Sequence, residues 1–323
     1  MLFEEQVSRK PNLYPWTQDF IDAIWESFWT PNEFNFRSDY SQFHSELTDV
    51  ERGVIIRTLS AIGQIEVAVK TFWANLGRNL PHPGLTDLGF VMANNEVIHN
   101  QAYEKLLDVL GLQEVFVKNL QEPIIQGRVN YLRKYLDRVY DDDRKQYVYA
   151  IILFTLFVEN VSLFSQFFII MYFNRFKNVL KDTAQQVEYT RNEEQLHAQV
   201  GIKIIQTLRH EYPELFDEEL EQRIQEELWA AYQAETKVID WILQGYWAPG
   251  LSNKILWSYI ADRMNTSMAQ IGFKGTLHVD NGHLIDTRWM DEESIGGSIT
   301  DFFQKRPVDY GKSTQTFSVE DLF

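Results

Sequence analysis

Two Glu-x-x-His pairs are the residues of this sequence whose types and spacing best suit chemistry. Glu96 and His99 form one pair in NNEVIHNQAY, and Glu194 and His197 form the other in YTRNEEQLHAQ. On a helix, residues three apart project from nearly the same face, so each pair can offer one carboxylate and one imidazole to a metal ion. Helical bundles that hold two irons or two manganeses use two such pairs and one further Glu from each of two other helices. The spacing therefore predicts two metal ions held between helices.

Glu66 and Glu159 are predicted to supply the two further carboxylates. Glu159 lies in the middle of the apolar run 151–173, and Glu66 lies within IGQIEVAV, so each is expected on a buried helix. Burying an unpaired carboxylate is costly, whereas four carboxylates balance the charge of two divalent ions. Oxygen and imidazole ligands without sulfur suit iron or manganese, and the donor types do not choose between these metals. The alternative is a set of Glu residues on solvated helix faces, with two His placed by chance.

Tyr103 and Lys70 are expected close to the metals. Tyr103 lies four residues after His99, and Lys70 lies four residues after Glu66, which is one helical turn in each case. Tyr103 is either a phenol that the metals can oxidise or a core tyrosine with a satisfied hydroxyl. Lys70 either forms a salt bridge with a Glu or donates a hydrogen bond to the phenol or to a metal-bound oxygen. The residues alone leave both choices open.

The composition limits the classes of protein that this chain can be. Its 323 residues are 45% hydrophobic, which suffices for a substantial core. A formal net charge of −16, without a basic stripe, argues against a nucleic-acid-binding protein. The chain has no cysteine, which removes disulfides, zinc-thiolate sites, iron–sulfur clusters and cysteine nucleophiles. Together with an acidic N-terminus unlike a signal peptide, this composition is typical of a cytoplasmic protein.

Four long helices are expected to position the predicted ligands, one for each Glu-x-x-His pair and one for each single Glu. Thr48 is the expected N-cap of the first helix, with Glu51 as its capping-box partner. The four helices are predicted at 48–77, 86–110, 151–173 and 177–210, with a loop at 81–84. Shorter or outer helices are predicted at 17–28, 217–243 and 252–270. Because strands and helices do not alternate, the predicted fold class is all-α, a ferritin-like bundle of long helices with the dimetal site in its core.

The run 151–173 is also long and apolar enough to suggest a membrane-spanning helix. Polar residues interrupt its middle, among them Glu159, where a charge in lipid would be expensive. A helix that is apolar all round and has one acidic residue at its centre instead fits the core of a large bundle. We therefore expect this helix inside the protein, with no membrane partner.

These segments resemble the small, radical-generating subunit of class I ribonucleotide reductase, and the resemblance covers most of the chain. NNEVIHNQAY resembles the family's first Glu-x-x-His segment, including its radical tyrosine at Tyr103, and RNEEQLH resembles the second. Glu66 takes the first carboxylate position, where many members have Asp, and Glu159 takes the remaining one. The resemblance implies the ligand set Glu66, Glu96, His99, Glu159, Glu194 and His197.

Two further segments resemble the family's electron-transfer route. FWTP, with Trp29, resembles an N-terminal Phe-Trp-x-Pro segment whose tryptophan belongs to that route. Glu193 falls where the family usually has an Asp coupled to the tryptophan and to the ligand that matches His99. FFQKRPVDY, ending at Tyr310, resembles the start of a mobile tail in which a tyrosine relays the radical to the large subunit.

The resemblance implies a mechanism shared between two subunits. The reduced dimetal site reacts with an oxygen species, and the oxidant is stored as a tyrosyl radical or on the metals. One oxidising equivalent then passes through Trp29 and Tyr310 to a cysteine of the large subunit, which reduces the ribonucleotide. Thr190 and Lys70 make the surroundings of Tyr103 more polar than is usual in the family, which fits those members that keep the oxidant on a dimanganese centre. A homodimer is also implied.

The end of the chain is expected to serve the partner subunit. Residues 1–304 are predicted to form the helical domain, and the polar residues 305–323 a flexible tail with an acidic and apolar end. Such a segment orders on a partner, although an ordinary frayed terminus has the same composition. Three competing functions remain open: a stand-alone dimetal oxidase or oxygenase, an iron-storage bundle, and a helical scaffold without metal.

Overall fold

The computed structural model describes residues 1–136 and 144–290, except for the side chains of residues 64, 66–68, 129 and 131–136. Within these residues no strand forms, apart from an isolated bridge between Ala248 and Leu251. The helices are α1 (Trp16–Glu26), η1 (Pro31–Glu33), α2 (Arg37–Ser45), α3 (Asp49–Ala74), α4 (Leu76–Asn79), α5 (Pro83–Leu110), α6 (Gln113–Asn119), α7 (Pro123–Leu136), α8 (Arg144–Leu153), the π-helix η2 (Phe154–Ser162), α9 (Phe164–Lys177), α10 (Lys181–Glu211), η3 (Pro213–Leu215), α11 (Glu218–Leu243), α12 (Asn253–Gln270), α13 (Asn281–Leu284) and η4 (Ile285–Thr287).

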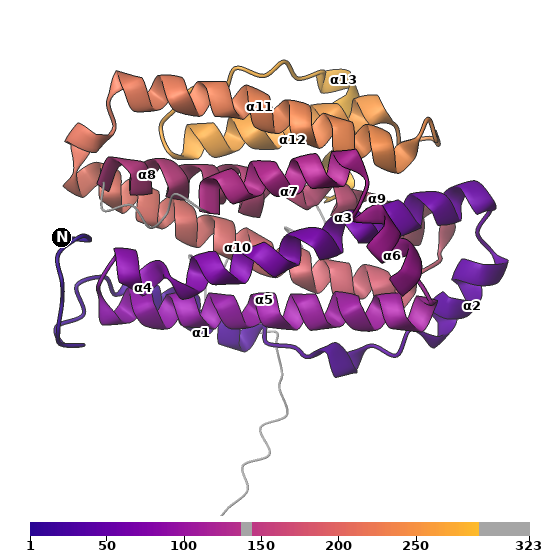
Figure 1. Ribbon diagram of the computed structural model, residues 1–323, viewed down its shortest axis with the longest axis horizontal. Coiled ribbons are helices and arrows are strands. Elements are labelled where there is room, and N and C mark those ends of the chain that lie inside the picture. The colour runs from indigo at the N-terminus through magenta and orange to yellow at the C-terminus, as the bar shows by residue number, and fades with distance from the viewer. Residues whose placement is uncertain (137–143, 291–323) are drawn as a thin grey trace, which may run out of the picture.

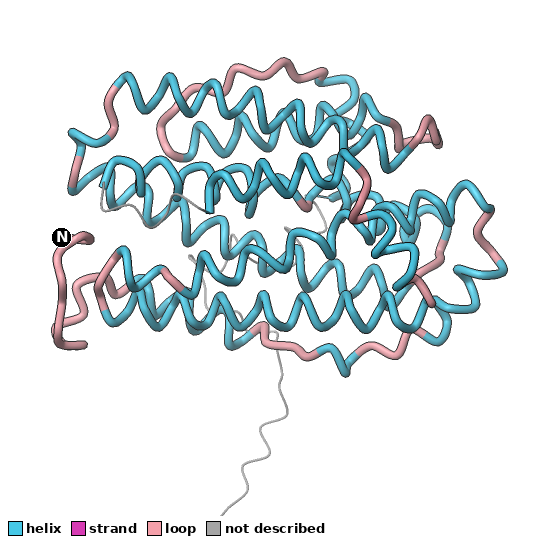
Figure 2. The backbone as a smooth tube through the Cα atoms, viewed as in Figure 1, coloured by secondary structure: helices cyan, strands magenta, loops and turns pink. Residues whose placement is uncertain are grey.

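The long helices pack side by side around one core. α3 packs on α5, α10 packs on η2 and α9, and α11 with α12 covers the opposite side of the bundle from α1 and α5 (Figure 1). Figure 2 shows most loops at the two ends of the bundle, whereas the connection between α1 and α2 runs along α5. Lys105 of α5 holds this connection, because its Nζ donates to the carbonyl oxygens of Pro31 and Phe34, at 2.8 Å each. The all-α prediction is confirmed.

The predicted caps of α3 and α5 form as local chemistry dictates, with one correction. The Thr48 side chain accepts from the Glu51 amide, and the Glu51 carboxylate accepts from the Thr48 amide, which completes the capping box. Gly111 ends α5 with a left-handed backbone (φ 70°). The expected loop at 81–84 is wrong at its second half, because α5 begins at Pro83. Proline is well suited to the first turn of a helix, where its missing N–H would lack a partner in any case.

The start of α10 also differs from the prediction. α10 begins at Lys181 rather than at residue 177, because Asn178 and Leu180 adopt left-handed backbone conformations that separate it from α9. Its first turn is capped from another helix: the buried Asp39 of α2 accepts from the amides of Asp182 and Thr183, at 3.2 and 2.7 Å. Asp182 in turn accepts from the Phe36 amide at the start of α2, at 2.9 Å. The two helices therefore cap each other.

The apolar run is a core helix. α8, η2 and α9 form one helix from Arg144 to Lys177 that is long and apolar enough to cross a membrane by length and composition alone. However, 94% of its apolar window is buried inside the protein. The other helices already cover the apolar surface that lipid would otherwise cover, as predicted for the core of a large bundle.

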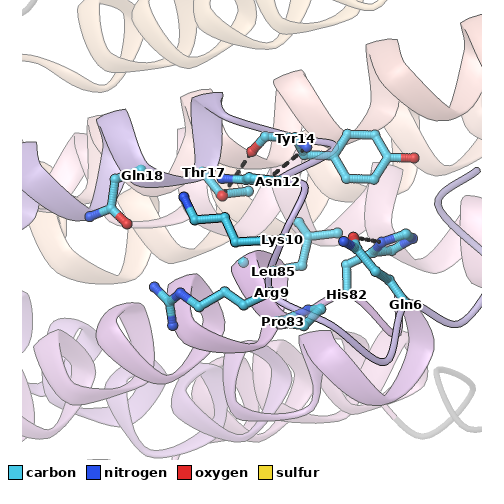
Figure 3. A pocket seen from close by; sticks show the side chains of 11 residues that line it. Gln6, Arg9, Lys10, Asn12, Tyr14, Thr17, Gln18, His82, Pro83 and Leu85 are labelled. Atoms are coloured by element: carbon cyan, nitrogen blue, oxygen red, sulfur yellow. Dashed lines mark hydrogen bonds between the residues drawn. The ribbon is translucent and has the colours of Figure 1, made fainter.

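The N-terminal segment closes over the start of α5. The Leu2 amide donates to the Glu211 carboxylate at 2.6 Å, which ties the segment to the end of α10. His82, just before α5, contacts the Met1 carbonyl through Nε2 and the Gln6 side chain through Nδ1. A small cavity of about 120 Å³ remains between this segment and the first turn of α5 (Figure 3). It lies more than two helical turns before Glu96 and takes no part in the site described next.

Candidate metal centre

Four predicted ligands meet in the centre of the bundle. α5 contributes Glu96, η2 contributes Glu159, and α10 contributes Glu194 and His197. One ligand atom from each of these side chains lies within 4.8 Å of the others, and all four side chains are buried. His99 belongs to the same cluster, since its Nδ1 lies 3.2 Å from Glu194 Oε1 and 3.4 Å from Glu96 Oε2. Five of the six predicted ligands therefore come together.

The sixth predicted ligand and three other predicted site residues are less fully described by the structure. Glu66 lies on α3, which packs on α5, but its side chain is outside the described residues. Lys70 is half-buried on the same helix. Tyr103 is buried on α5, one turn after His99. Tyr310 lies outside the described residues. The functional roles of these residues stay predictions.

The donor atoms of the cluster suit a cation. Both carboxylate oxygens of Glu96, Oε2 of Glu159 and both ring nitrogens of His197 are buried and lack a hydrogen-bond partner among the described residues. His197 Nδ1 lies 2.9 Å from Glu96 Oε1 and 3.6 Å from one oxygen each of Glu159 and Glu194. Three buried carboxylates around one imidazole would be costly without positive charge. The residues therefore fit a bound metal, with oxygen and nitrogen donors that suit iron or manganese.

The same crowding perturbs the pKa values of the cluster. Burial, followed by the neighbouring Glu194 carboxylate, raises the pKa of Glu159 well above its usual value. Burial also acts to raise the pKa of Glu194, but the imidazoles of His197 and His99 beside it outweigh burial and lower that pKa. Burial acts to lower the pKa of His197, and the surrounding carboxylates, Glu96 foremost, raise it well above its usual value. The raised pKa values of Glu159 and His197 mean that protons compete with a metal for these ligand atoms.

A π-helix and a tryptophan position Glu159, and sequence reasoning predicted neither. Glu159 lies within η2, a wide helical segment of the kind that often marks functional sites. Its Oε1 accepts from the buried indole Nε1 of Trp73 at 2.8 Å. Trp73 follows Glu66 by seven residues, which is about two helical turns and places both residues on one side of α3. That spacing is the signal by which Trp73 could have been found.

A series of close polar contacts leads from the cluster to Trp29, and the electron-transfer role of its residues stays a prediction. Glu193 Oε2 accepts from the Trp29 indole at 2.9 Å and lies 2.6 Å from His99 Nε2. The rings of Trp29 and His99 stack with centroids 6.1 Å apart. When His99 carries its ring proton on Nε2, beside Glu193, its Nδ1 lone pair points toward Glu96 and Glu194, which is how carboxylates commonly orient metal-bound imidazoles.

The outer end of this series reaches the surface. A hollow of about 240 Å³ opens over Trp29 and Glu193 and is also lined by Phe28 and Tyr189. The Phe28 side chain is 42% exposed, whereas Trp29 is only 2% exposed. Trp29 thus lies at the floor of the hollow, between the buried cluster and the protein surface. This arrangement can connect the cluster with a bound partner.

Comparison with known proteins agrees with this geometry. The chain is similar to the ribonucleoside-diphosphate reductase subunit beta of Halalkalibacterium halodurans, with 22% identity over 96% of this chain and 90% of the relative. Its fold is that of the ribonucleotide reductase R2 subunit from Clostridium botulinum, with a TM-score of 0.79, 22% identity, and coverage of 87% and 88% of the two chains. An R2-like ligand-binding oxidase with a Mn/Fe cofactor has the same fold, with a TM-score of 0.68, 17% identity, and coverage of 84% and 99%. Because the ribonucleotide reductase small chain family matches residues 7–282, the chain belongs to that family.

Proposed function

We propose that this chain is the radical-generating small subunit of a ribonucleoside-diphosphate reductase and is active only with the large subunit. The observation that carries the proposal is the series from His99 through Glu193 to Trp29, which ends at a surface hollow. A stand-alone dimetal oxidase shares the fold and needs the metal cluster, but it has no use for a route to the surface. An iron-storage bundle needs neither.

Two metal ions, manganese or iron, are the proposed cofactor. Glu96, His99, Glu159, Glu194 and His197 would hold them, with Glu66 as the sixth ligand. When bound, the metals supply the one-electron oxidising power that the reductase needs, through reaction with an oxygen species. The polar residues Lys70 and Thr190 favour storage on a dimanganese centre, and Tyr103 is the alternative store.

Glu193 is proposed to move a proton in step with the electron. When Trp29 loses an electron, its indole N–H becomes strongly acidic, and Glu193 Oε2 lies 2.9 Å away, ready to accept the proton. When the electron returns, the proton goes back to the indole nitrogen. Both side chains are 2% exposed, so little of either is available to water that would compete for this proton. The pair can therefore transfer an oxidising equivalent reversibly.

The remaining steps lie with the partner and the tail. Tyr310 is proposed to carry the oxidising equivalent from Trp29 to a cysteine of the large subunit, which the cysteine-free chain itself cannot supply. Residues 305–323 are proposed to bind that subunit through Phe317, Leu322 and Phe323. The subunit is proposed to act as a homodimer in the cytoplasm.

Removal of the tail tests this function. A chain ending at residue 304 is expected to keep its metal content and its electron paramagnetic resonance signal, because the cluster residues are intact. Its reductase activity with the large subunit is expected to be lost. The matched control is the full chain with Tyr310→Phe, which keeps the docking segment and loses only the radical carrier. A truncated chain that retains full reductase activity would contradict the role of the tail, whereas a full-length chain that loads metal but has no reductase activity with the large subunit would point instead to a stand-alone oxidase.

A further inference from the structure

The π-helix that carries Glu159 is held from outside by side chains of other helices. The Arg128 guanidinium of α7 donates to the Ser162 carbonyl at the end of η2. Arg263 Nε of α12 donates to the Asn160 carbonyl at 2.9 Å. The Ser162 hydroxyl donates to the Phe157 carbonyl at 2.7 Å. Buried carbonyl groups need partners, and in this wide helical segment side chains supply some of them.

Arg128 also forms hydrogen bonds to several other helices. Besides Ser162, it donates to both carboxylate oxygens of Glu235 on α11, at 3.2 Å each, and to the Gln166 side chain on α9, at 3.2 Å. Its Nη1 donates to the Ala61 carbonyl of α3 at 3.1 Å. One buried guanidinium thereby connects α7 with α3, η2, α9 and α11.

Burying the Arg128–Glu235 ion pair has a large desolvation cost. Both side chains are 1% exposed, and a buried ion pair is often no more stabilising than apolar residues of similar volume. What apolar residues could not replace is the set of donors in fixed directions, since a guanidinium presents five N–H groups in one plane. Such a rigid set of donors fixes the relative positions of the backbones that it touches.

Those backbones hold Glu159 from two sides. η2 carries Glu159 itself, three residues before Ser162. α3 carries Trp73, whose indole donates to the Glu159 carboxylate. Arg128 contacts both elements at once, through Ser162 and Ala61. We propose that Arg128, held by Glu235, is a positioning residue of the metal centre, which sets the place of the Glu159 carboxylate between η2 and α3.

The inference rests on the proposed metal centre and is tested by metal binding rather than by activity. The double variant Arg128→Met/Glu235→Leu replaces the ion pair by apolar side chains and is expected to fold, with an unfolding temperature lowered only by the loss of the donors to the Ser162 and Ala61 carbonyl groups. Mn²⁺ is titrated into the metal-free protein, and the free ion is measured by electron paramagnetic resonance. The wild type is expected to bind two ions per chain. In the double variant, one of the two ions is expected to bind about 10- to 100-fold more weakly, which is typical of losing an outer-shell partner.

Two further variants separate the effect of the Arg128 donor geometry from the effects of protein stability and of positive charge. Arg128→Lys keeps the positive charge beside Glu235, but one ammonium cannot replace the planar set of donors, so the same weakening of one site is expected. Arg223→Met is the matched control, because Arg223 of α11 lies over the Tyr149 ring of α8, with 4.0 Å between its guanidinium carbon and the ring centroid. It is expected to bind both ions as the wild type does. Wild-type Mn²⁺ affinity and spectrum in the double variant or in Arg128→Lys would overturn the inference alone, whereas a wild type that binds no Mn²⁺ would overturn the proposed function as well.

Discussion

Replacing Glu193 by Gln should separate storage of the oxidant from its transfer. Glu193 Oε2 accepts a hydrogen bond from the Trp29 indole at 2.9 Å and lies 2.6 Å from His99 Nε2. Gln keeps the shape of the side chain but cannot carry the negative charge or take up a proton. The metals should therefore still bind and the stored oxidant should still form, while transfer to the large subunit should be slowed.

The size of the effect follows from the two contacts. A hydrogen bond to a charged group contributes about 1.5–3 kcal/mol, compared with about 0.5–1.5 kcal/mol for a neutral one. Two contacts weakened in this way amount to about 2–3 kcal/mol, or a decrease of about 30- to 150-fold in turnover, since about 1.4 kcal/mol is tenfold. Glu193, Trp29 and His99 are all buried, so solvent does not screen the loss of the negative charge. Loss of the proton acceptor would add to it.

The assay compares three quantities on one preparation of Glu193→Gln: metal per chain, the electron paramagnetic resonance signal of the oxidant, and turnover with the large subunit. Glu188→Gln, a partly exposed residue of the same helix, is the control and should behave as the wild type. Wild-type turnover in Glu193→Gln would refute the transfer role. A variant that fails to load metal would show that Glu193 acts only by holding His99.

Three further predictions concern how the bundle holds its shape. Asp39→Ala should lower the free energy of unfolding in urea by about 1–3 kcal/mol, because buried amides at the start of α10 lose their acceptor; no change would contradict the capping role. Gly201→Ala should destabilise by about 1–3 kcal/mol, because its Cβ would lie 2.1 Å from Thr155 Oγ1, and Thr155→Ala should restore part of the loss. Burial acts to raise the pKa of Glu51, but hydrogen bonds, that from Lys177 foremost, outweigh it and lower the pKa. Its stabilising effect is therefore present above the unfolded pKa and lost as pH falls through the folded pKa, so thermal unfolding of Glu51→Gln should differ from the wild type at neutral pH and converge with it in acid.

Local signals in the sequence predicted most of the fold. The capping box at Thr48 and Glu51 and the glycine stop at Gly111 depend on neighbours within a few residues, so they could be predicted without tertiary information. The start of α10 could not, because its cap comes from Asp39 of another helix. The π-helix is likewise invisible in the local sequence, since residues such as Arg128 on distant helices hold its carbonyls.

The candidate site shows the same division. The two Glu-x-x-His pairs have a helical spacing that is visible in the sequence, and the structure brings them together. Trp73 was missed because a core tryptophan is common, and only the packing of α3 against η2 shows that its indole serves Glu159. The series from His99 to Trp29 was predicted from the family resemblance rather than from spacing, because it joins residues of three separate segments.

The most direct test of the central claim is low-temperature electron paramagnetic resonance of the activated protein, with metal content measured on the same sample. Two metal ions per chain and a signal of the stored oxidant are expected. A narrow organic signal that disappears in Tyr103→Phe would locate the oxidant on tyrosine, and a broad multiline manganese signal that survives Tyr103→Phe would locate it on the metals. Metal content well below two ions per chain, together with neither signal, would contradict the account.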